Sequence, residues 1–212
     1  MLPSPETLLA FIAASVLITI APGPDNLMVL GHGISRGREA GIAVALGCAL
    51  GCATHTLWAA LGVSAVIAAS EAAFFVLKLL GGGYLLWLGI NALRHAGETP
   101  VREDAALALH DSARYLRRGF IANAVNPKVA LFFLAFLPQF VDTAAASVTS
   151  QILVLGGLFA IQTAVIFSAI AYFSAVIGLW LARRPGAGRW LDRASGALFV
   201  GLGLKLAFSA RP

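Results

Sequence analysis

Two charged residues lie inside strongly apolar stretches of this sequence and are the first candidates for chemistry. Asp25 interrupts an apolar run over residues 8–30, and Lys128 interrupts another over residues 119–141. If these runs cross a membrane, each charge lies at bilayer depth, where insertion costs about 2.5 to 3.5 kcal/mol. Such a residue normally has a partner, a water-filled cavity or a function. Asp25 could be protonated or pair with Lys128, and Lys128 could instead bind a carboxylate.

Helix-breaking residues stand directly before both charges. Pro-Gly-Pro occupies positions 22–24, and Asn-Pro occupies positions 126–127. Because proline removes a backbone donor, both runs should be broken helices whose free backbone groups face a cavity. The N-terminus of such a half-helix carries partial positive charge that suits an anion.

The two charges could share one site. A helical rise of about 1.5 Å per residue places Asp25 and Lys128 at similar depths in the cytoplasmic half of the membrane. The simpler alternatives are that Asp25 caps a helix and that Lys128 extends toward the cytoplasm.

His55 is a polar residue inside the second apolar run. It could relay protons near neutral pH or hydrogen-bond to a neighbouring helix, and both interpretations stay open. Gly47 and Gly51 precede it on the same helical face and permit close helix packing. Cys48 and Cys52 share a face with His55 and resemble a soft-metal ligand set. The sequence offers no other intramembrane cluster of Cys or Met to complete that set, so packing of small residues is the favoured interpretation.

The elements that must position these residues are membrane helices. Apolar residues make up 59% of the chain and charged residues only 12%, whereas ordinary domains carry about a quarter charged residues. Runs of about 20 apolar residues span a bilayer, and only helices satisfy the backbone of such segments. The fold class is therefore all-α, a polytopic membrane protein with a single transmembrane domain over residues 1–212. The six predicted spans cover residues 8–30, 40–69, 72–93, 119–141, 148–182 and 190–208, and a cytoplasmic connector covers 94–118.

The distribution of basic residues predicts the topology. Lys and Arg gather after the first span, in the 94–118 connector and between the last two spans. Because basic loops stay on the cytoplasmic side, both termini should lie outside the cytoplasm. The basic residues form no stripe, so nucleic-acid binding is not expected.

Equal division of the spans predicts two inverted halves with three spans each. The broken helices are then the first and fourth spans, one in each half. Gly82 and Gly89 in the third span align with Gly196 and Gly203 in the sixth, which is slight support for a duplication.

Several longer motifs extend over nearly the whole chain. They are PGPD at 22–25, LKLLGGGYLLWLGINALR at 77–94, NPK at 126–128, FLPQF at 136–140, and SGALFVGLGLKLA near the end. In these motifs the chain resembles the lysine exporter (LysE/RhtB) superfamily of bacterial amino-acid efflux permeases, in particular exporters of the homoserine, threonine and leucine type.

The resemblance implies a multi-pass secondary transporter of the bacterial inner membrane that exports amino acids or their derivatives, by proton antiport or driven by the membrane potential. It implies no enzyme activity, no cofactor and no resident metal. The partners are the amino-acid substrate and the lipid bilayer, and a homo-oligomer is left open. Asp25 becomes the candidate proton carrier and Lys128 the candidate carboxylate contact. The candidate binding and coupling residues are Pro22, Gly23, Pro24, Asp25, Asn26, His55, Asn126, Pro127, Lys128 and Gln139.

Two alternatives differ in their chemistry. A heavy-metal or other small-solute exporter of the same fold would use Cys48, Cys52 and His55. A membrane-embedded enzyme would need catalytic groups clustered at one interface, and the sequence offers no such cluster. Among amino acids, the shortage of intramembrane carboxylates argues against a dibasic cargo, which would need counter-charges.

Overall fold

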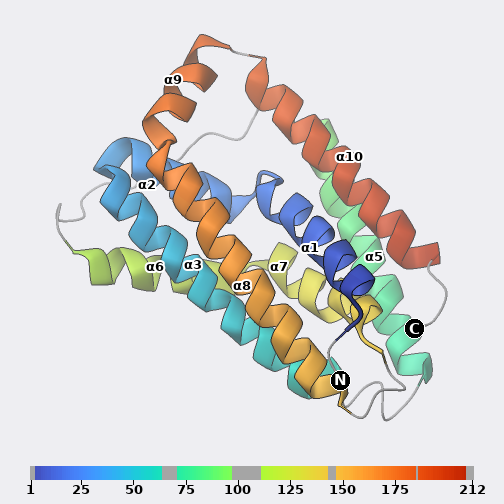
Figure 1. Cartoon of the computed structure of the whole chain (residues 1–212). Coiled ribbons are helices and arrows are strands. Elements are labelled where there is room, and N and C mark those ends of the chain that lie inside the picture. Colours follow the sequence, from blue (N-terminus) through green and yellow to red (C-terminus); the bar gives the residue numbers. More distant parts are fainter. Residues whose placement is uncertain (1–2, 64–70, 97–110, 143–146, 185, 209–212) are drawn as a thin grey trace.

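The computed structural model describes residues 3–63, 71–96, 111–142, 147–184 and 186–208. Within these ranges all regular structure is helical (Figure 1), which confirms the predicted all-α class. The end of the predicted second span, 64–69, and most of the connector, 97–110, lie outside the described residues. The longer helices are α1 (Pro5–Ile20), α2 (Pro24–Arg36), α3 (Arg38–Trp58), α5 (Glu71–Arg94), α6 (Ser112–Ala124), α8 (Val148–Tyr172), α9 (Ser174–Arg183) and α10 (Ala187–Phe208).

Both predicted helix breaks are confirmed. Helix α1 ends before the Pro-Gly-Pro tripeptide, and α2 leaves it with a bend of 57°. Helix α6 ends before Asn126, and the chain continues through the short helix α7 (Pro127–Leu131) with a bend of 49°. After α7 follow a π-helical turn, Phe132–Phe136, and a 3₁₀ turn, Leu137–Phe140.

The helix of the fourth span begins earlier than predicted. The stretch before residue 119 is polar and is predicted as part of the connector, yet α6 starts at Ser112. The Asp111 side chain caps this helix by accepting a hydrogen bond from the Arg114 backbone N–H at 3.0 Å. A cap and good helix formers therefore extend the helix into polar sequence.

The predicted fifth span is two helices rather than one. Helix α8 ends at Tyr172, and α9 begins at Ser174 and runs in a new direction (Figure 1). Ser174 is fully buried against Gly33 of α2, so contact with α2 accompanies the change in direction.

Two helices of the described residues are long and apolar enough to cross a membrane by themselves. They are Arg38–Gly62 and Val148–Tyr172, and the number rises to four if each bent pair counts as one span. These helices agree with a multi-pass membrane protein.

Glycines bring α3 and α6 into backbone contact. A Cβ atom added at Gly47 would clash with the Leu116 carbonyl oxygen, and one at Gly119 would clash with the Val44 oxygen. Neither position can hold a larger side chain without moving the helices apart. The prediction that Gly47 serves close helix packing is confirmed.

Helices α5 and α10 pack through two glycine pairs. A Cβ at Gly82 would lie 3.2 Å from the Gly203 oxygen, and one at Gly89 would lie 2.7 Å from the Gly196 oxygen. The pairing runs in opposite directions along the two helices, so they are antiparallel (Figure 1).

The ends of the described chain and the α2–α3 turn lie at opposite ends of the helical assembly. The N- and C-terminal ends of the described chain lie at the same end of the molecule, and the turn between α2 and α3 lies at the opposite end together with α9 (Figure 1). Gly37 makes the α2–α3 turn with a φ of 91°, a conformation that favours glycine. The two helix breaks meet between these ends, in the centre of the assembly.

Candidate functional site

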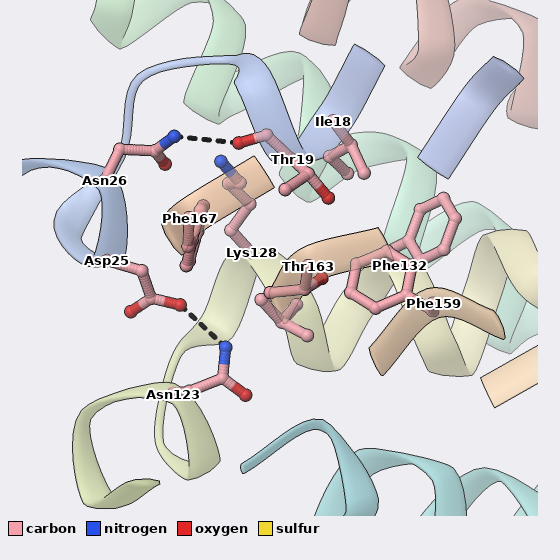
Figure 2. Close-up of a pocket in the computed structure, with 11 residues that line it drawn as sticks. Ile18, Thr19, Asp25, Asn26, Asn123, Lys128, Phe132, Phe159, Thr163 and Phe167 are labelled. Carbon is pink, nitrogen blue, oxygen red and sulfur yellow. Dashed lines mark hydrogen bonds between the residues drawn. The ribbon is translucent and has the colours of Figure 1, made fainter. Parts of the chain in front are cut away.

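A buried pocket lies where the two broken helices meet (Figure 2). One wall carries polar side chains from both breaks and from α8, and the other carries aromatic and aliphatic side chains. The free space holds about one water molecule. The lining residues are Ile18, Thr19, Asp25, Asn26, Asn123, Lys128, Val129, Phe132, Phe159, Thr163 and Phe167.

Lys128 reaches from α7 across to the first break. Its side chain is 7% exposed, and its Nζ donates to the Ala21 carbonyl oxygen at 2.8 Å. Ala21 follows the last residue of α1, where helix carbonyls lack intrahelical partners. Gly23 makes this approach possible, since an added Cβ there would lie 3.0 Å from Nζ. A buried ammonium with this bond is not a side chain extended toward the cytoplasm.

Asp25 lies in the first turn of α2 and is 3% exposed. Its Oδ2 accepts a hydrogen bond from Asn123 Nδ2 at 2.7 Å, while its Oδ1 has no partner. The N-cap of α2 is Gly23, which makes no side-chain cap. Asp25 is therefore not the helix cap, and its carboxylate is directed to the other broken helix (Figure 2).

Asn26 joins the end of α1 to the start of α2. Its Nδ2 donates to the Thr19 carbonyl oxygen at 2.8 Å, and its Oδ1 is buried without a partner. The Thr19 hydroxyl accepts a hydrogen bond from Gln162 of α8 at 2.7 Å. The first break is thus held to α8 by polar contacts.

A family model described as LysE type translocator matches residues 16–210. The chain belongs to this family. Among its relatives, the membrane protein PA4757 of Pseudomonas aeruginosa is 33% identical over 200 residues, covering 93% of each chain. The leucine efflux protein of Enterobacter sp. (strain 638) is 29% identical over 93% of this chain and of its own. The homoserine/homoserine lactone efflux protein of Salmonella typhimurium is 30% identical over 95% of this chain and 96% of its own. No solved structure matches.

Membership of the family confirms a membrane transporter rather than an enzyme. In this LysE-type translocator, His55 lies beside the pocket rather than in its lining. Its Nε2 is 2.8 Å from the Asn123 backbone oxygen, and its ring lies 5.8 Å from that of Phe133. The bond to α6 matches the interpretation of His55 as a helix-packing residue, and it also ties α3 to the residue that holds Asp25.

The two cysteines of the translocator are fully buried on α3. Cys52 Sγ donates to the Cys48 carbonyl oxygen at 3.4 Å, while His55 faces α6. Among the described residues, no group of three or more His, Cys, Asp or Glu side chains could hold a metal ion. The geometry gives no support to the metal-exporter alternative.

The remaining predicted site residues act on the backbone or lie elsewhere. Asn126 caps α7 by accepting from the Lys128 N–H at 3.0 Å, and Pro127 opens that helix. Pro22 and Pro24 bracket Gly23 in the first break. Gln139 lies in the 3₁₀ turn after α7 and does not line the pocket.

Sequence reasoning missed several lining residues. Asn123 is the most important, because it holds Asp25 from 98 positions away. Its position three residues before Asn126, inside the predicted fourth span, was an available signal. Thr19 and Thr163 gave no signal, since threonine is common in membrane helices. The aromatic wall of Phe132, Phe159 and Phe167 resembles any apolar core in sequence.

Proposed function

We propose that this translocator exports amino acids or their derivatives across the bacterial inner membrane through the pocket between its two broken helices. The observation that carries the proposal is one buried carboxylate and one buried ammonium lining the same pocket, Asp25 and Lys128. An amino acid carries the complementary pair of charges. The relatives named for leucine efflux and for homoserine efflux, which align over more than 90% of both chains, support the same class of cargo.

Lys128 is the proposed contact for the substrate carboxylate. Its ammonium is now held by a neutral carbonyl, that of Ala21. A carboxylate forms a stronger, charge-assisted hydrogen bond with an ammonium, so it competes with the carbonyl for Nζ. The first turn of α2 adds partial positive charge at the same break. Binding of a carboxylate would therefore release the end of α1 from α7.

Asp25 is the proposed proton carrier. A protonated carboxyl group is far easier to bury than a carboxylate, and Asp25 is buried. The titratable groups that interact electrostatically with it are Lys128 from α7 and Cys48, Cys52 and His55 from α3. Protonation from outside and release to the cytoplasm would couple the proton gradient to export.

The size of the pocket requires a conformational change. Space for about one water molecule cannot hold an amino acid. The half-helices at the breaks are the elements that would move, because bends of 57° and 49° already interrupt their backbone hydrogen bonding. The bond between Lys128 and Ala21 links the two moving parts.

We further infer six spans in two inverted halves, with both termini outside the cytoplasm. In such a repeat, Gly82 corresponds to Gly196 and Gly89 to Gly203. A twofold axis in the membrane plane then converts the contact of Gly82 with Gly203 into the contact of Gly196 with Gly89. Both contacts exist at the antiparallel α5–α10 interface, which supports the inverted plan.

Transport by the purified protein tests the proposal. The native chain is reconstituted in liposomes, a proton gradient is imposed, and uptake of a labelled amino-acid panel is compared with that of Lys128→Ala and Asp25→Asn. We expect gradient-dependent uptake of one or more amino acids and its loss in both variants. Uptake that persists in both variants would keep the exporter and remove the site. A folded protein that moves no amino acid would overturn the export proposal.

A further inference from the structure

Asp25 and Asn26 line the pocket, and each has a buried side-chain oxygen without a hydrogen-bond partner, Oδ1 in both residues. We propose that these two side-chain oxygens form the binding site for the α-ammonium group of the transported amino acid. The proposal rests on the export function above and adds the recognition of the second charged group of the cargo. It is supported by the unsatisfied oxygen of Asp25, the bond of Lys128 to the Ala21 carbonyl and the orientation of the two asparagine amides. The charges around the first helix break support it as well.

Asp25 is a buried carboxylate with half of its hydrogen-bonding capacity unused. Asn123, a neutral donor, satisfies Oδ2 at 2.7 Å, and Oδ1 is buried without a partner. An ionised carboxylate in apolar surroundings is stable only when it is paired or well hydrogen-bonded. The single hydrogen bond from Asn123 neither neutralises the charge nor saturates the carboxylate. A bound cation would therefore stabilise the ionised form of Asp25.

Lys128 does not supply that cation. Its Nζ donates to the Ala21 oxygen at 2.8 Å and lies over the ring of Phe199 of α10, 5.6 Å from the ring centre. The ammonium is therefore directed to the end of α1 rather than to Asp25. The positive and the negative charge of the pocket are held apart, each ready for an opposite charge on a ligand.

The orientation of the amides is fixed by their partners. The Thr19 carbonyl oxygen can only accept, so the NH₂ group of Asn26 must face it and the free atom must be Oδ1. The same reasoning applies to Asn123, whose NH₂ group faces a carboxylate oxygen. The free atoms of Asp25 and Asn26 are thus both acceptors, on consecutive residues of one helical turn (Figure 2).

An ammonium group is the complement of this arrangement. It carries three N–H donors and a full positive charge. The N-terminus of α2 opposes it with roughly half a positive charge, but the full negative charge of Asp25 is larger and closer to the free oxygens. The N-terminal dipole therefore favours the carboxylate end of the cargo at Lys128, and Asp25 favours the ammonium end.

Analogues that lack the ammonium test the proposal. Native protein in proteoliposomes takes up the labelled form of the amino acid identified in the panel. The competitor is either the same amino acid without label or its desamino analogue, the carboxylic acid that lacks the α-amino group. We expect the native protein to prefer the amino acid over the analogue by roughly 10- to 100-fold, the contribution of a charged hydrogen bond. Asn26→Leu should reduce that preference several-fold. Asp25→Asn, which is expected to lose transport, should reduce it several-fold when competition is measured by equilibrium binding of the labelled amino acid to the purified protein. Asn91→Leu on α5, away from the pocket, is the matched control and should keep the native preference.

Each result has a distinct meaning. If the analogue competes with uptake by the native protein as well as the amino acid does, the ammonium site is overturned. This result needs no variant, so the test holds even if the variants misfold. A preference that is unchanged in both pocket variants also overturns it, because the ammonium is then recognised elsewhere. A third result is that uptake by the native protein depends saturably on Na⁺. If this dependence disappears in the two pocket variants while the preference for the amino acid persists, the oxygens bind sodium and the ammonium site is overturned. Absence of any amino-acid uptake by native protein overturns the export function, and the site with it.

Discussion

At the scale of single residues, Lys128 is the side chain whose removal should have the largest effect on transport. Lys128→Met keeps most of the volume but removes the donor to the Ala21 oxygen and the proposed contact for the substrate carboxylate. We expect uptake to fall roughly 10-fold or more, the contribution of a hydrogen bond to a charged group. Initial rates of gradient-driven uptake in proteoliposomes measure it.

Lys205→Met is the matched control for that change. Lys205 lies exposed near the end of α10 and should tolerate the loss of its charge with little change in uptake. Equal loss in the two variants would mean that Lys128 has no special role in transport.

His55 separates two mechanisms at the same scale. Its Nε2 bonds to the Asn123 backbone oxygen, a contact that the amide donor of His55→Gln can replace. We expect this variant to transport with an unchanged dependence on pH, because a packing residue needs only a donor. If His55 relays protons, uptake by His55→Gln at its optimal pH should instead collapse, since an amide does not titrate. A pH series of uptake rates distinguishes the two.

At the scale of helices, the contact between α3 and α6 sets the position of Asn123. Gly119→Ala drives a Cβ into the Val44 oxygen, so the helices must separate. Overpacking of this kind costs about 1 to 3 kcal/mol, and we expect a lower thermal midpoint in detergent. Gly157→Ala on α8, where nothing lies within 4 Å of the added Cβ, should leave the midpoint unchanged.

The second helix break depends on a side-chain cap. Asn126 Oδ1 accepts from the Lys128 N–H at 3.0 Å at the start of α7. Asn126→Ala removes the acceptor and should lower the free energy of unfolding by about 1 kcal/mol, whereas Asn126→Ser keeps a cap and should lose less. Denaturation of both variants in the same detergent measures the difference. An alanine variant as stable as the serine variant would show that the cap contributes nothing to the break.

At the scale of the whole molecule, the ends of the chain test the proposed topology. The N- and C-terminal ends of the described chain lie at one end of the molecule (Figure 1), and the basic connectors predict that the other end faces the cytoplasm. Alkaline phosphatase fused after Pro212 should therefore lie outside the cytoplasm and be active. A fluorescent protein fused at the same position should lie on the same side and be dark. A fusion within the turn between α2 and α3 should give the reverse pattern.

The same fusions give a clear contradiction. A fluorescent C-terminal fusion without phosphatase activity would place that end in the cytoplasm. Either the number of spans would then be odd or the whole topology would be reversed.

The sequence alone determined the class of the molecule and its local interruptions. Composition requires membrane helices because lipid offers no partner to a free backbone group, and proline inside a helical run interrupts it. The breaks at 22–24 and 126–127 follow from residues that are neighbours in the chain. For the same reason, the local sequence suffices to assign Asp25 to the start of a half-helix.

Only the tertiary structure decided which groups meet at the pocket. The sequence left open whether Lys128 pairs with Asp25 or binds a carboxylate ligand, and the structure pairs it with the Ala21 carbonyl. Asn123, not Lys128, holds Asp25. These contacts join residues about a hundred positions apart, and they depend on the angle of each break and on the glycine contacts between α3 and α6. A local sequence pattern carries no information about either, because both result from the packing of the whole helical assembly.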